Sequence, residues 1–187
     1  IDFIDIDPET YCLSISELEK KLNNAAKNGE LPTAIVPVHF AGQSCEMSRV
    51  HELSQQYGFK VVEDASHAIG GEYNKNKIGN CEFSDVSVFS FHPVKIVTTG
   101  EGGMVVTNSV ELYEKLVLFR SHGITREVSI MANSDPEPWY YEQVELGMNY
   151  RMTDIHAVIG LSQLKRIDQF VKKRHQIAQR YNGELKK

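Results

Sequence analysis

Short apolar runs alternate with longer segments of helical periodicity along the first half of the chain. The runs at residues 33–38, 59–62 and 86–91 are rich in β-branched and aromatic side chains, and each predicts a buried strand. Over residues 47–57 apolar positions recur every three or four residues up to Gly58, which predicts a helix ended by a cap glycine. Strand, helix and strand in this order predict parallel strands with a right-handed crossover, and therefore an α/β fold.

Three further helices are predicted outside this unit. The first begins at Ser16, which fits a capping box with the glutamate three residues later. The second is an amphipathic helix over residues 110–120. The third starts after Thr153, carries an apolar side, and becomes polar and basic over residues 165–187. Residues 130–145 contain two prolines and the only tryptophan, so they predict a long irregular surface loop.

Several polar side chains follow the ends of the predicted strands, where open α/β sheets bind their ligands. Asp64 and His67 follow the second strand, and Ser90 and Lys95 lie at the end of the third. Lys95 stands between an apolar strand and an apolar loop, a setting that disfavours its ammonium form and makes its amine a nucleophile or a base. The alternative interpretation is a lysine at a loop mouth with its amine in water.

Composition and charge exclude several classes of function. The 187 residues carry a net charge of −5 without a long basic run, so nucleic acid and anionic membranes are poor candidate partners. No apolar run approaches the length of a membrane span. The spacing of Cys12, Cys45 and Cys81 fits neither a disulfide framework nor a zinc site, which favours a reducing cytoplasm.

The motif search leaves the lysine at the centre of the chemistry. The chain has no dinucleotide fingerprint, P-loop, serine-hydrolase elbow or zinc-protease motif. A strand-end acid followed about thirty residues later by a loop lysine is one signature of pyridoxal phosphate enzymes, in which the lysine forms an imine and the acid pairs with the pyridine nitrogen. The spacing from Asp64 to Lys95 fits this signature, although other α/β proteins can show it by chance.

Four motifs occur in order: EDASHA at 63–68, SFHPVK at 90–95, GEGG at 100–103 and NYRM at 149–152. Together they resemble the sugar-nucleotide aminotransferases of the DegT/DnrJ/EryC1/StrS family, over nearly the whole chain. Within that family, the segments at 119–123 and 160–164 are most similar to the transaminases of pseudaminic acid biosynthesis. The resemblance implies a fold-type I pyridoxal phosphate-dependent transferase, which is an aspartate aminotransferase-like fold.

The resemblance also implies a domain organisation. Members of the family are considerably longer, so residues 1–187 are expected to be the central part of a pyridoxal phosphate-binding large domain. The N-terminal segment, which cradles the cofactor phosphate in the family, and the small C-terminal domain are expected to be missing. Residues 165–187 are then a helix that leads towards the small domain.

Five residues take cofactor-binding roles by this resemblance. Lys95 would form the Schiff base with the cofactor and then move the proton during catalysis. Asp64 would pair with the pyridinium nitrogen, and His67 would contact the phenolic oxygen of the ring. Ser90 would donate to the phosphate. Asn149 would reach the phosphate of the neighbouring subunit, which requires a homodimer with shared active sites.

The implied reaction moves an amino group from L-glutamate to C4 of a UDP-linked 4-keto-6-deoxy-N-acetylhexosamine. Tyr150 and Arg151 would face the nucleotide sugar, with a purely structural role as the open alternative. Amination of another position or of another nucleotide ketosugar remains an alternative, as does a non-catalytic scaffold with the same fold. Sugar dehydratases of this fold replace the lysine by histidine, so Lys95 argues against that activity.

Overall fold

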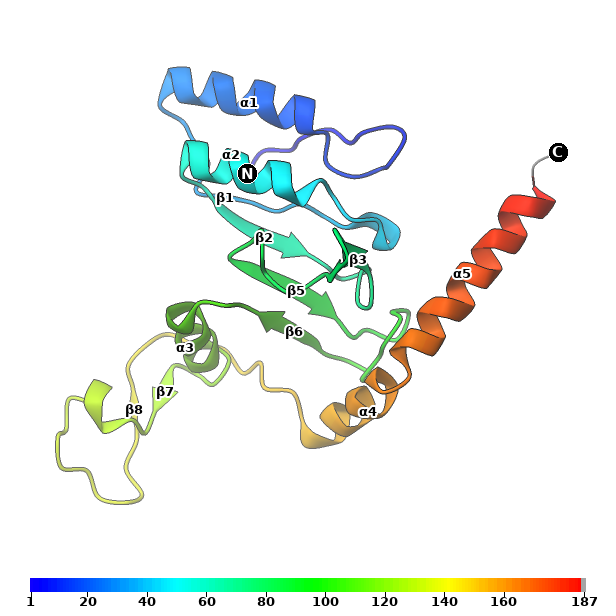
Figure 1. Ribbon diagram of the computed structural model, residues 1–187. Helices are drawn as coiled ribbons and strands as arrows, with labels where there is room; N and C mark the ends of the chain where they lie inside the picture. Colours follow the sequence, from blue (N-terminus) through cyan, green and yellow to red (C-terminus); the bar gives the residue numbers. More distant parts are fainter. Residues whose placement is uncertain (186–187) are drawn as a thin grey trace.

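A computed structural model describes residues 1–185 and builds them around one four-stranded sheet (Figure 1). Its strands, in the order β1-β2-β5-β6, are β1 (Ala34–Ile35), β2 (Lys60–Asp64), β5 (Val86–Ser90) and β6 (Gly103–Val106). The first three are parallel, as the strand–helix–strand pattern predicts, whereas β6 is antiparallel to β5. The chain reverses between β5 and β6, and this reversal contains the lysine loop.

The strand predicted over residues 33–38 is shorter than expected. Only Ala34 and Ile35 form a regular ladder with β2, and Val38 makes one isolated parallel bridge to Asp64. Pro37 lies between these two contacts and lacks the N–H that a continuous ladder requires.

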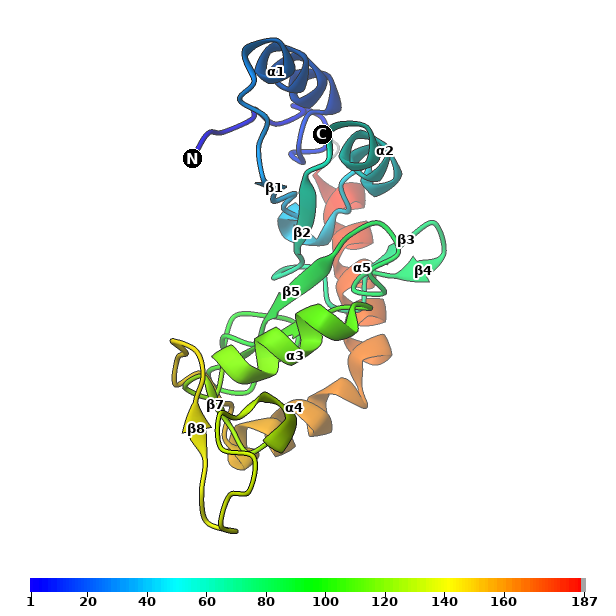
Figure 2. The ribbon, with the colours of Figure 1, turned by 90° about the vertical axis from the view of Figure 1, so that its left-hand side faces the viewer.

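Two helices cover one side of the sheet. α2 (Met47–Tyr57) packs against β2, and α1 (Ile15–Asn28) packs on α2 (Figures 1 and 2). The predicted cap of α2 is confirmed, because Gly58 has a φ of 80°, a left-handed conformation that glycine adopts without steric cost. The contact between these elements forms the larger core cluster, which contains buried side chains from both helices and the sheet, among them Leu18, Leu22, Val50, Leu53 and Val61.

The capping box predicted at Ser16 is wrong by two residues. Ser14 is the N-cap, with an extended backbone and a side-chain oxygen that accepts from the Glu17 N–H. Ser16 lies inside the first turn, and its hydroxyl is 3.2 Å from that of Ser14.

The long loop predicted over residues 130–145 contains more structure than expected. A two-residue strand, β8 (Glu142–Gln143), pairs antiparallel with β7 (Ile124–Thr125). A short 3₁₀ turn, η2 (Val128–Ile130), lies between them. Glu142 also accepts hydrogen bonds from the N–H groups of Ala132 and Asn133, which close the intervening segment. Alternating strand patterns cannot reveal strands this short.

A hairpin, a 3₁₀ turn and a helix follow strands of the sheet. The hairpin of β3 (Glu72–Tyr73) and β4 (Asn76–Lys77) follows β2, and the 3₁₀ turn η1 (Phe40–Gly42) follows β1. α3 (Val110–Phe119) follows β6, as the amphipathic pattern predicts.

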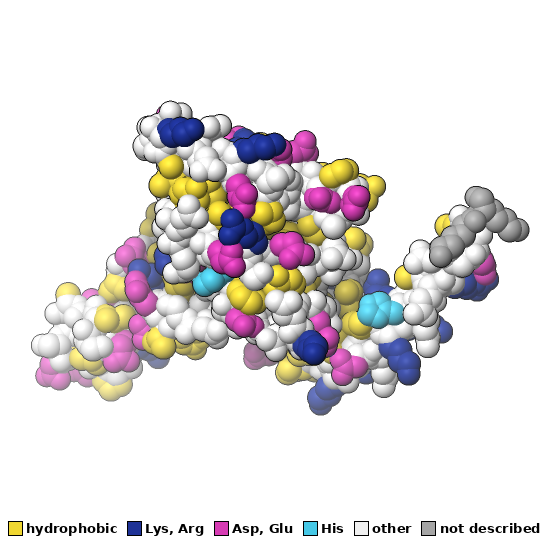
Figure 3. All heavy atoms as spheres, turned by 45° about the horizontal axis from the view of Figure 1, so that its top comes forward, with side chains coloured by type: hydrophobic (Ala, Val, Ile, Leu, Met, Phe, Trp, Pro, Cys, Tyr) yellow, Lys and Arg dark blue, Asp and Glu magenta, His cyan; other side chains and the backbone are white. Residues whose placement is uncertain are grey.

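The single final helix predicted after Thr153 is two helices in the structure. Thr153 does cap α4 (Asp154–Leu164), but Arg166 has a non-helical backbone and separates it from α5 (Ile167–Glu184). The break lets Ile167 pack directly on Gly70 and join the second core cluster. α5 then projects away from the rest of the molecule (Figure 1). On the face of the molecule shown in Figure 3, the described side chains of both charges are scattered and form no large patch of one sign. The last two residues of the predicted 165–187 segment lie outside the described residues.

All three cysteines are buried free thiols. The thiols of Cys12, Cys45 and Cys81 each lie 3.2–3.3 Å from a backbone carbonyl oxygen, of Gln43, Val38 and Val106 respectively. Burial raises the pKa of the Cys45 thiol to about 12. Within residues 1–185, no helix combines the length and the apolar character needed to cross a membrane.

Candidate active site

The sheet brings Asp64 and Ser90 to the same edge. β2 ends at Asp64 and β5 ends at Ser90, and because the two strands are parallel their carboxyl ends lie side by side. Asp64 is half-buried, and its Oδ1 accepts from the Ser66 N–H at 3.0 Å. Ser90 is also half-buried and accepts from the His92 N–H at 3.4 Å. The edge therefore presents a carboxylate and a hydroxyl on adjacent strands. We call this edge, with His67 and Lys95 just beyond the same two strands, the rim.

His67 is exposed just beyond β2, and its ring is held by the turn that follows β1. Its Nδ1 accepts from the Ala41 N–H at 3.3 Å, and its ring meets Phe40 edge-on with centroids 6.0 Å apart. A neutral imidazole that accepts at Nδ1 carries its proton on Nε2. His67 can therefore donate a hydrogen bond from Nε2 to an anionic oxygen on the rim.

Lys95 lies in a loop that is tied at its base. The carbonyl oxygen of Phe91 accepts from the Thr99 N–H at 3.0 Å and from the Thr98 hydroxyl at 2.9 Å, which closes residues 92–98 into a compact loop. Within it, the Lys95 N–H donates to the His92 carbonyl at 3.0 Å. The Lys95 side chain is half-buried, and no carboxylate of residues 1–185 forms an ion pair with it. The loop backbone thus holds residue 95 just beyond the end of β5, and the Lys95 amine has no carboxylate partner in the described chain.

The lysine loop also rests on α4. The Thr98 N–H donates to the Gln163 side-chain oxygen at 3.2 Å. A Cβ placed on Gly160 would lie 2.8 Å from the methyl carbon of Thr99, so only glycine permits this close approach. Helix α4 therefore acts as a support for the loop, a role that the sequence did not predict.

The other three predicted site residues lie on a separate segment. Asn149 forms an isolated antiparallel β-bridge with Ser121, and the Tyr150 N–H donates to the Arg120 carbonyl at 3.0 Å. The backbone of this segment is therefore fixed to the end of α3. Asn149, Tyr150 and Arg151 are exposed, Tyr150 by 76%. In the described residues no hydrogen bond joins them to the rim residues.

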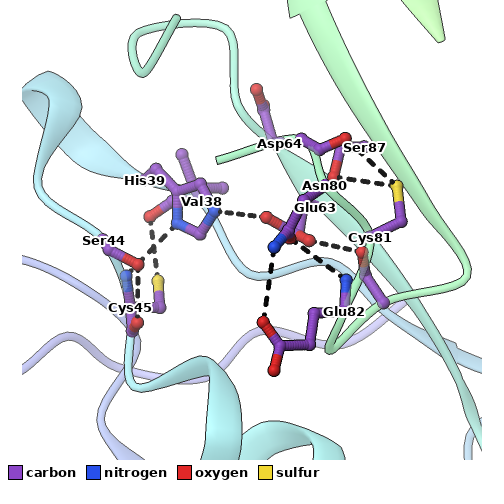
Figure 4. Close-up of polar contacts among 12 residues, drawn as sticks. Val38, His39, Ser44, Cys45, Glu63, Asp64, Asn80, Cys81, Glu82 and Ser87 are labelled. Carbon is purple, nitrogen blue, oxygen red and sulfur yellow. Dashed lines mark hydrogen bonds and ion pairs between the residues drawn. The ribbon is translucent and has the colours of Figure 1, made fainter. Parts of the chain in front are cut away.

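A buried polar cluster that the sequence did not predict lies behind the rim (Figure 4). His39 is fully buried and Glu63 is 5% exposed, and His39 Nε2 lies 2.8 Å from Glu63 Oε2. His39 Nδ1 accepts from the Cys45 N–H at 3.2 Å, so Nε2 bears the proton and donates to Glu63. The hydroxyl of Ser84 donates to the other oxygen of Glu63.

Two opposing effects set the pKa of Glu63. Burial raises it, but hydrogen bonds from His39, Ser84 and Ser87 outweigh burial and hold the pKa of this carboxyl below its ordinary value. Glu63 is therefore a buried carboxylate at neutral pH. One signal for this cluster exists in the sequence: adjacent acids in a strand point to opposite faces, so one of Glu63 and Asp64 must face the interior and requires partners there.

The rim residues fit the chemistry of pyridoxal phosphate. The ring offers a basic nitrogen to a carboxylate, an anionic phenolic oxygen to an N–H donor, and an aldehyde to an amine, which Asp64, His67 and Lys95 respectively supply. No cluster of three or more metal-ligating side chains occurs in residues 1–185.

A mixed sheet with these strand ends and this lysine loop defines the fold-type I class of pyridoxal phosphate-dependent transferases, an α/β fold. A family model, that of the DegT/DnrJ/EryC1/StrS aminotransferases, matches residues 2–187. The chain belongs to this family, whose aminotransferases depend on pyridoxal phosphate. The resemblance found in the four sequence motifs is thereby confirmed.

Known relatives refine this placement. The chain is 40% identical over 187 residues to the UDP-4-amino-4,6-dideoxy-N-acetyl-beta-L-altrosamine transaminase of Campylobacter jejuni, covering 100% of this chain and 46% of that protein. It is 38% identical over 183 residues to the GDP-perosamine synthase of Escherichia coli O157:H7, covering 98% and 45%.

Among solved structures, the chain is similar to Helicobacter pylori PseC, an aminotransferase involved in the biosynthesis of pseudoaminic acid. The TM-score is 0.86 at 37% identity, and the match covers 99% of this chain and 45% of that one. The chain therefore spans less than half the length of each of these three proteins.

Proposed function

We propose that the protein transfers an amino group from L-glutamate to C4 of a UDP-linked 4-keto-6-deoxy-N-acetylhexosamine, in the biosynthesis of pseudaminic acid or a related surface sugar. The observation that carries this proposal is the rim, where Asp64 and the Lys95 loop follow the ends of adjacent parallel strands. The similarity to the C. jejuni transaminase supports the choice of substrate.

Each rim residue has a defined task in this proposal. Bound pyridoxal phosphate supplies the electron sink for the transfer. Lys95 Nζ would hold the cofactor covalently and would then carry the proton between the reacting carbons. Asp64 would keep the ring nitrogen protonated, and His67 would donate from Nε2 to the phenolic oxygen. Ser90 would donate its hydroxyl to the phosphate.

The exposed segment after β8 suits a shared site in a homodimer. Asn149 is proposed to reach the cofactor phosphate of the partner subunit, and Tyr150 and Arg151 to face the nucleotide sugar. Their exposure, and the attachment of their backbone to residues 120 and 121 at the end of α3, support this assignment. We further propose that residues 1–187 are the central part of the large domain, and that the protein works in the cytoplasm, where free thiols stay reduced.

A second candidate acceptor is a GDP-linked ketosugar. The similarity to GDP-perosamine synthase, at 38% identity, is close to the similarity to the UDP-sugar enzyme and favours testing this alternative. Both acceptors use the same rim, so the choice between them rests on the residues that contact the nucleotide.

Lys95→Ala is expected to remove the yellow absorbance of the lysine-bound cofactor and to lower turnover by at least about 1,000-fold, because the covalent attachment and the proton carrier are lost together. The measurement is an absorbance spectrum of the full-length protein with pyridoxal phosphate, before and after L-glutamate, followed by turnover with the UDP-linked and the GDP-linked ketosugar.

Lys172→Ala on α5 is the matched control, because it removes an exposed lysine remote from the loop. The control should keep both the spectrum and the turnover of the wild type. Transamination by Lys95→Ala at the wild-type rate would refute the proposed function, and a wild type without any cofactor band would favour the scaffold alternative.

A further inference from the structure

The turn between β1 and α2 contacts both Asp64 and His67, although it supplies no residue to the rim itself. We propose that the buried pair of His39 and Glu63 anchors this turn and thereby positions Asp64 and His67 against the cofactor ring. The inference rests on the proposed function for its cofactor, but the contacts that carry it belong to this chain alone.

The first contacts are made by the backbone of Asp64. Its N–H donates to the Pro37 carbonyl at 2.9 Å, and its carbonyl accepts from the His39 N–H at 3.0 Å. Both backbone groups of Asp64 are thus bound to the segment 37–39. A shift of that segment would tilt the Asp64 carboxylate, because the side chain follows its own backbone.

The second contacts fix that segment from inside the protein. The His39 ring is bound on both nitrogens, by the Cys45 N–H at Nδ1 and by Glu63 at Nε2. Glu63 directly precedes Asp64 in β2 and points to the other face of the sheet (Figure 4). The hydrogen bond between Glu63 and His39 therefore fixes the end of β2 on the buried face of the sheet. The Asp64 side chain points to the opposite face, where it can meet the cofactor.

The third contact extends the same anchor to His67. The turn η1 continues directly from His39, and its Ala41 N–H is the donor that sets the tautomer of His67. Ala41 adopts a φ of 52°, and a Cβ on Gly42 would lie 3.1 Å from the His67 carbonyl oxygen, so the turn is held closely against residue 67. Loss of the His39 anchor would release this donor and let His67 sample both tautomers.

Within residues 1–185, the side chains of His39 and Glu63 form no hydrogen bond with a rim side chain, so they are positioning residues. Supporting residues of this kind set the geometry of the groups that do touch a ligand, and at metal sites their removal costs about 10–100-fold in affinity or activity.

Two substitutions of His39 separate its two hydrogen bonds. Asparagine can place an acceptor where Nδ1 stood but cannot reach Glu63, whereas glutamine can place a donor where Nε2 stood. In the full-length protein, His39→Asn is expected to raise the dissociation constant for pyridoxal phosphate about tenfold and to shift its absorbance maximum. His39→Gln should restore both values towards the wild type.

A readout without cofactor tests the positioning directly. In the cofactor-free protein, the ¹⁵N signals of the His67 ring should report a protonated Nε2 in the wild type and an average of both tautomers in His39→Asn. Glu63→Gln provides a second variant if His39→Asn does not fold, since it keeps the shape of the side chain and removes its charge. It should move the His67 signals in the same direction.

Leu18→Ala is the control for general destabilisation, because Leu18 is fully buried in α1 and contributes to the larger core cluster away from the rim. It should lower the melting temperature without changing the His67 signals or the cofactor spectrum. The inference is overturned if the His39 and Glu63 variants match Leu18→Ala in both readouts. A wild type that does not bind pyridoxal phosphate would refute the proposed function, and the His67 signals would still decide the role of the turn.

Discussion

Two neighbouring carboxylates at the end of β2 have opposite environments. Asp64 faces the rim and remains half-exposed, whereas Glu63 is buried and accepts from His39 and Ser84. A strand alternates its side chains between faces, so one step along the backbone separates a group that can meet a ligand from a group that holds the fold.

The pH dependence of stability should reveal the buried carboxylate. The folded-state pKa of Glu63 lies below its ordinary value of 4.5, so its stabilisation is complete above that pH and is lost as the pH falls through the folded-state pKa. At pH 7, Glu63→Gln is expected to lower the free energy of unfolding by about 2 kcal/mol, the range of charge-assisted hydrogen bonds.

Denaturant titrations of both proteins at pH values from 7 down to 3 measure this effect. The difference between wild type and variant should narrow below pH 4.5. Glu111→Gln, which changes an exposed carboxylate on α3, serves as the control with a small effect at every pH. A difference for Glu63→Gln that stays constant over the whole pH range would contradict the assignment of a lowered pKa.

At the residue scale, the sequence identified candidates for the groups that face a ligand, which stay predictions, and it missed the buried groups that support them. Asp64 and Lys95 were predicted because they follow strand patterns and belong to recognisable motifs. His39 and Glu63 could not be paired from the sequence, because 24 positions separate them and only the parallel register of β1 and β2 brings them together. Side-chain partners across a sheet depend on register, which local patterns do not fix.

The lysine loop depends on a helix that is distant in the sequence. Gln163 of α4 accepts from the Thr98 N–H, and the two residues are 65 positions apart. Gln163→Leu should leave this N–H without its partner and lower the free energy of unfolding by about 1 kcal/mol. A looser loop is also expected to slow the attachment of pyridoxal phosphate to Lys95, which stopped-flow absorbance can follow.

Two companion variants sharpen this prediction. Gln163→Glu keeps an acceptor oxygen at the same position and should retain most of the wild-type attachment rate. Gln169→Leu, on the exposed surface of α5, should leave the rate unchanged. If Gln163→Leu and Gln169→Leu behave alike, the hydrogen bond to Thr98 does not control the loop.

At the element scale, long amphipathic segments were predicted well, and the ends of elements less well. The N-cap at Ser14 and the break at Arg166 differ from the predictions because tertiary packing selects among nearby options. Ser14 and Ser16 are both acceptable caps by propensity, and the contact of Ile167 with Gly70 favours a new helix direction.

The whole molecule leaves an apolar surface on α4 uncovered by residues 1–185. The sequence predicted an apolar side for this helix, but its side chains are exposed, Ile155 by 75% and Val158 by 64%. Sequence patterns identify an apolar face without identifying what covers it, so the partner of α4 could not be predicted.

The proposed homodimer offers one cover for this surface. Ile155→Glu combined with Val158→Glu is expected to raise the dimer dissociation constant by about 100-fold, because both charges would have to be buried in the contact. Sedimentation equilibrium of the full-length protein measures the change. Gln169→Glu adds a charge on α5 as a control, and an unchanged dissociation constant in the double variant would place the subunit contact elsewhere.

The three buried thiols can report on local unfolding of the regions that surround them. Cys12 and Cys45 lie in the core cluster beneath α1 and α2, while Cys81 is hydrogen-bonded to the carbonyl of Val106 at the end of β6. An alkylating reagent can reach each sulfur only when its surroundings separate, so the labelling rate of each thiol measures how often that region opens. The labelling rates of Cys12 and Cys45 thus report on the opening of the core beneath α1 and α2, and the rate of Cys81 reports separately on the opening around β6.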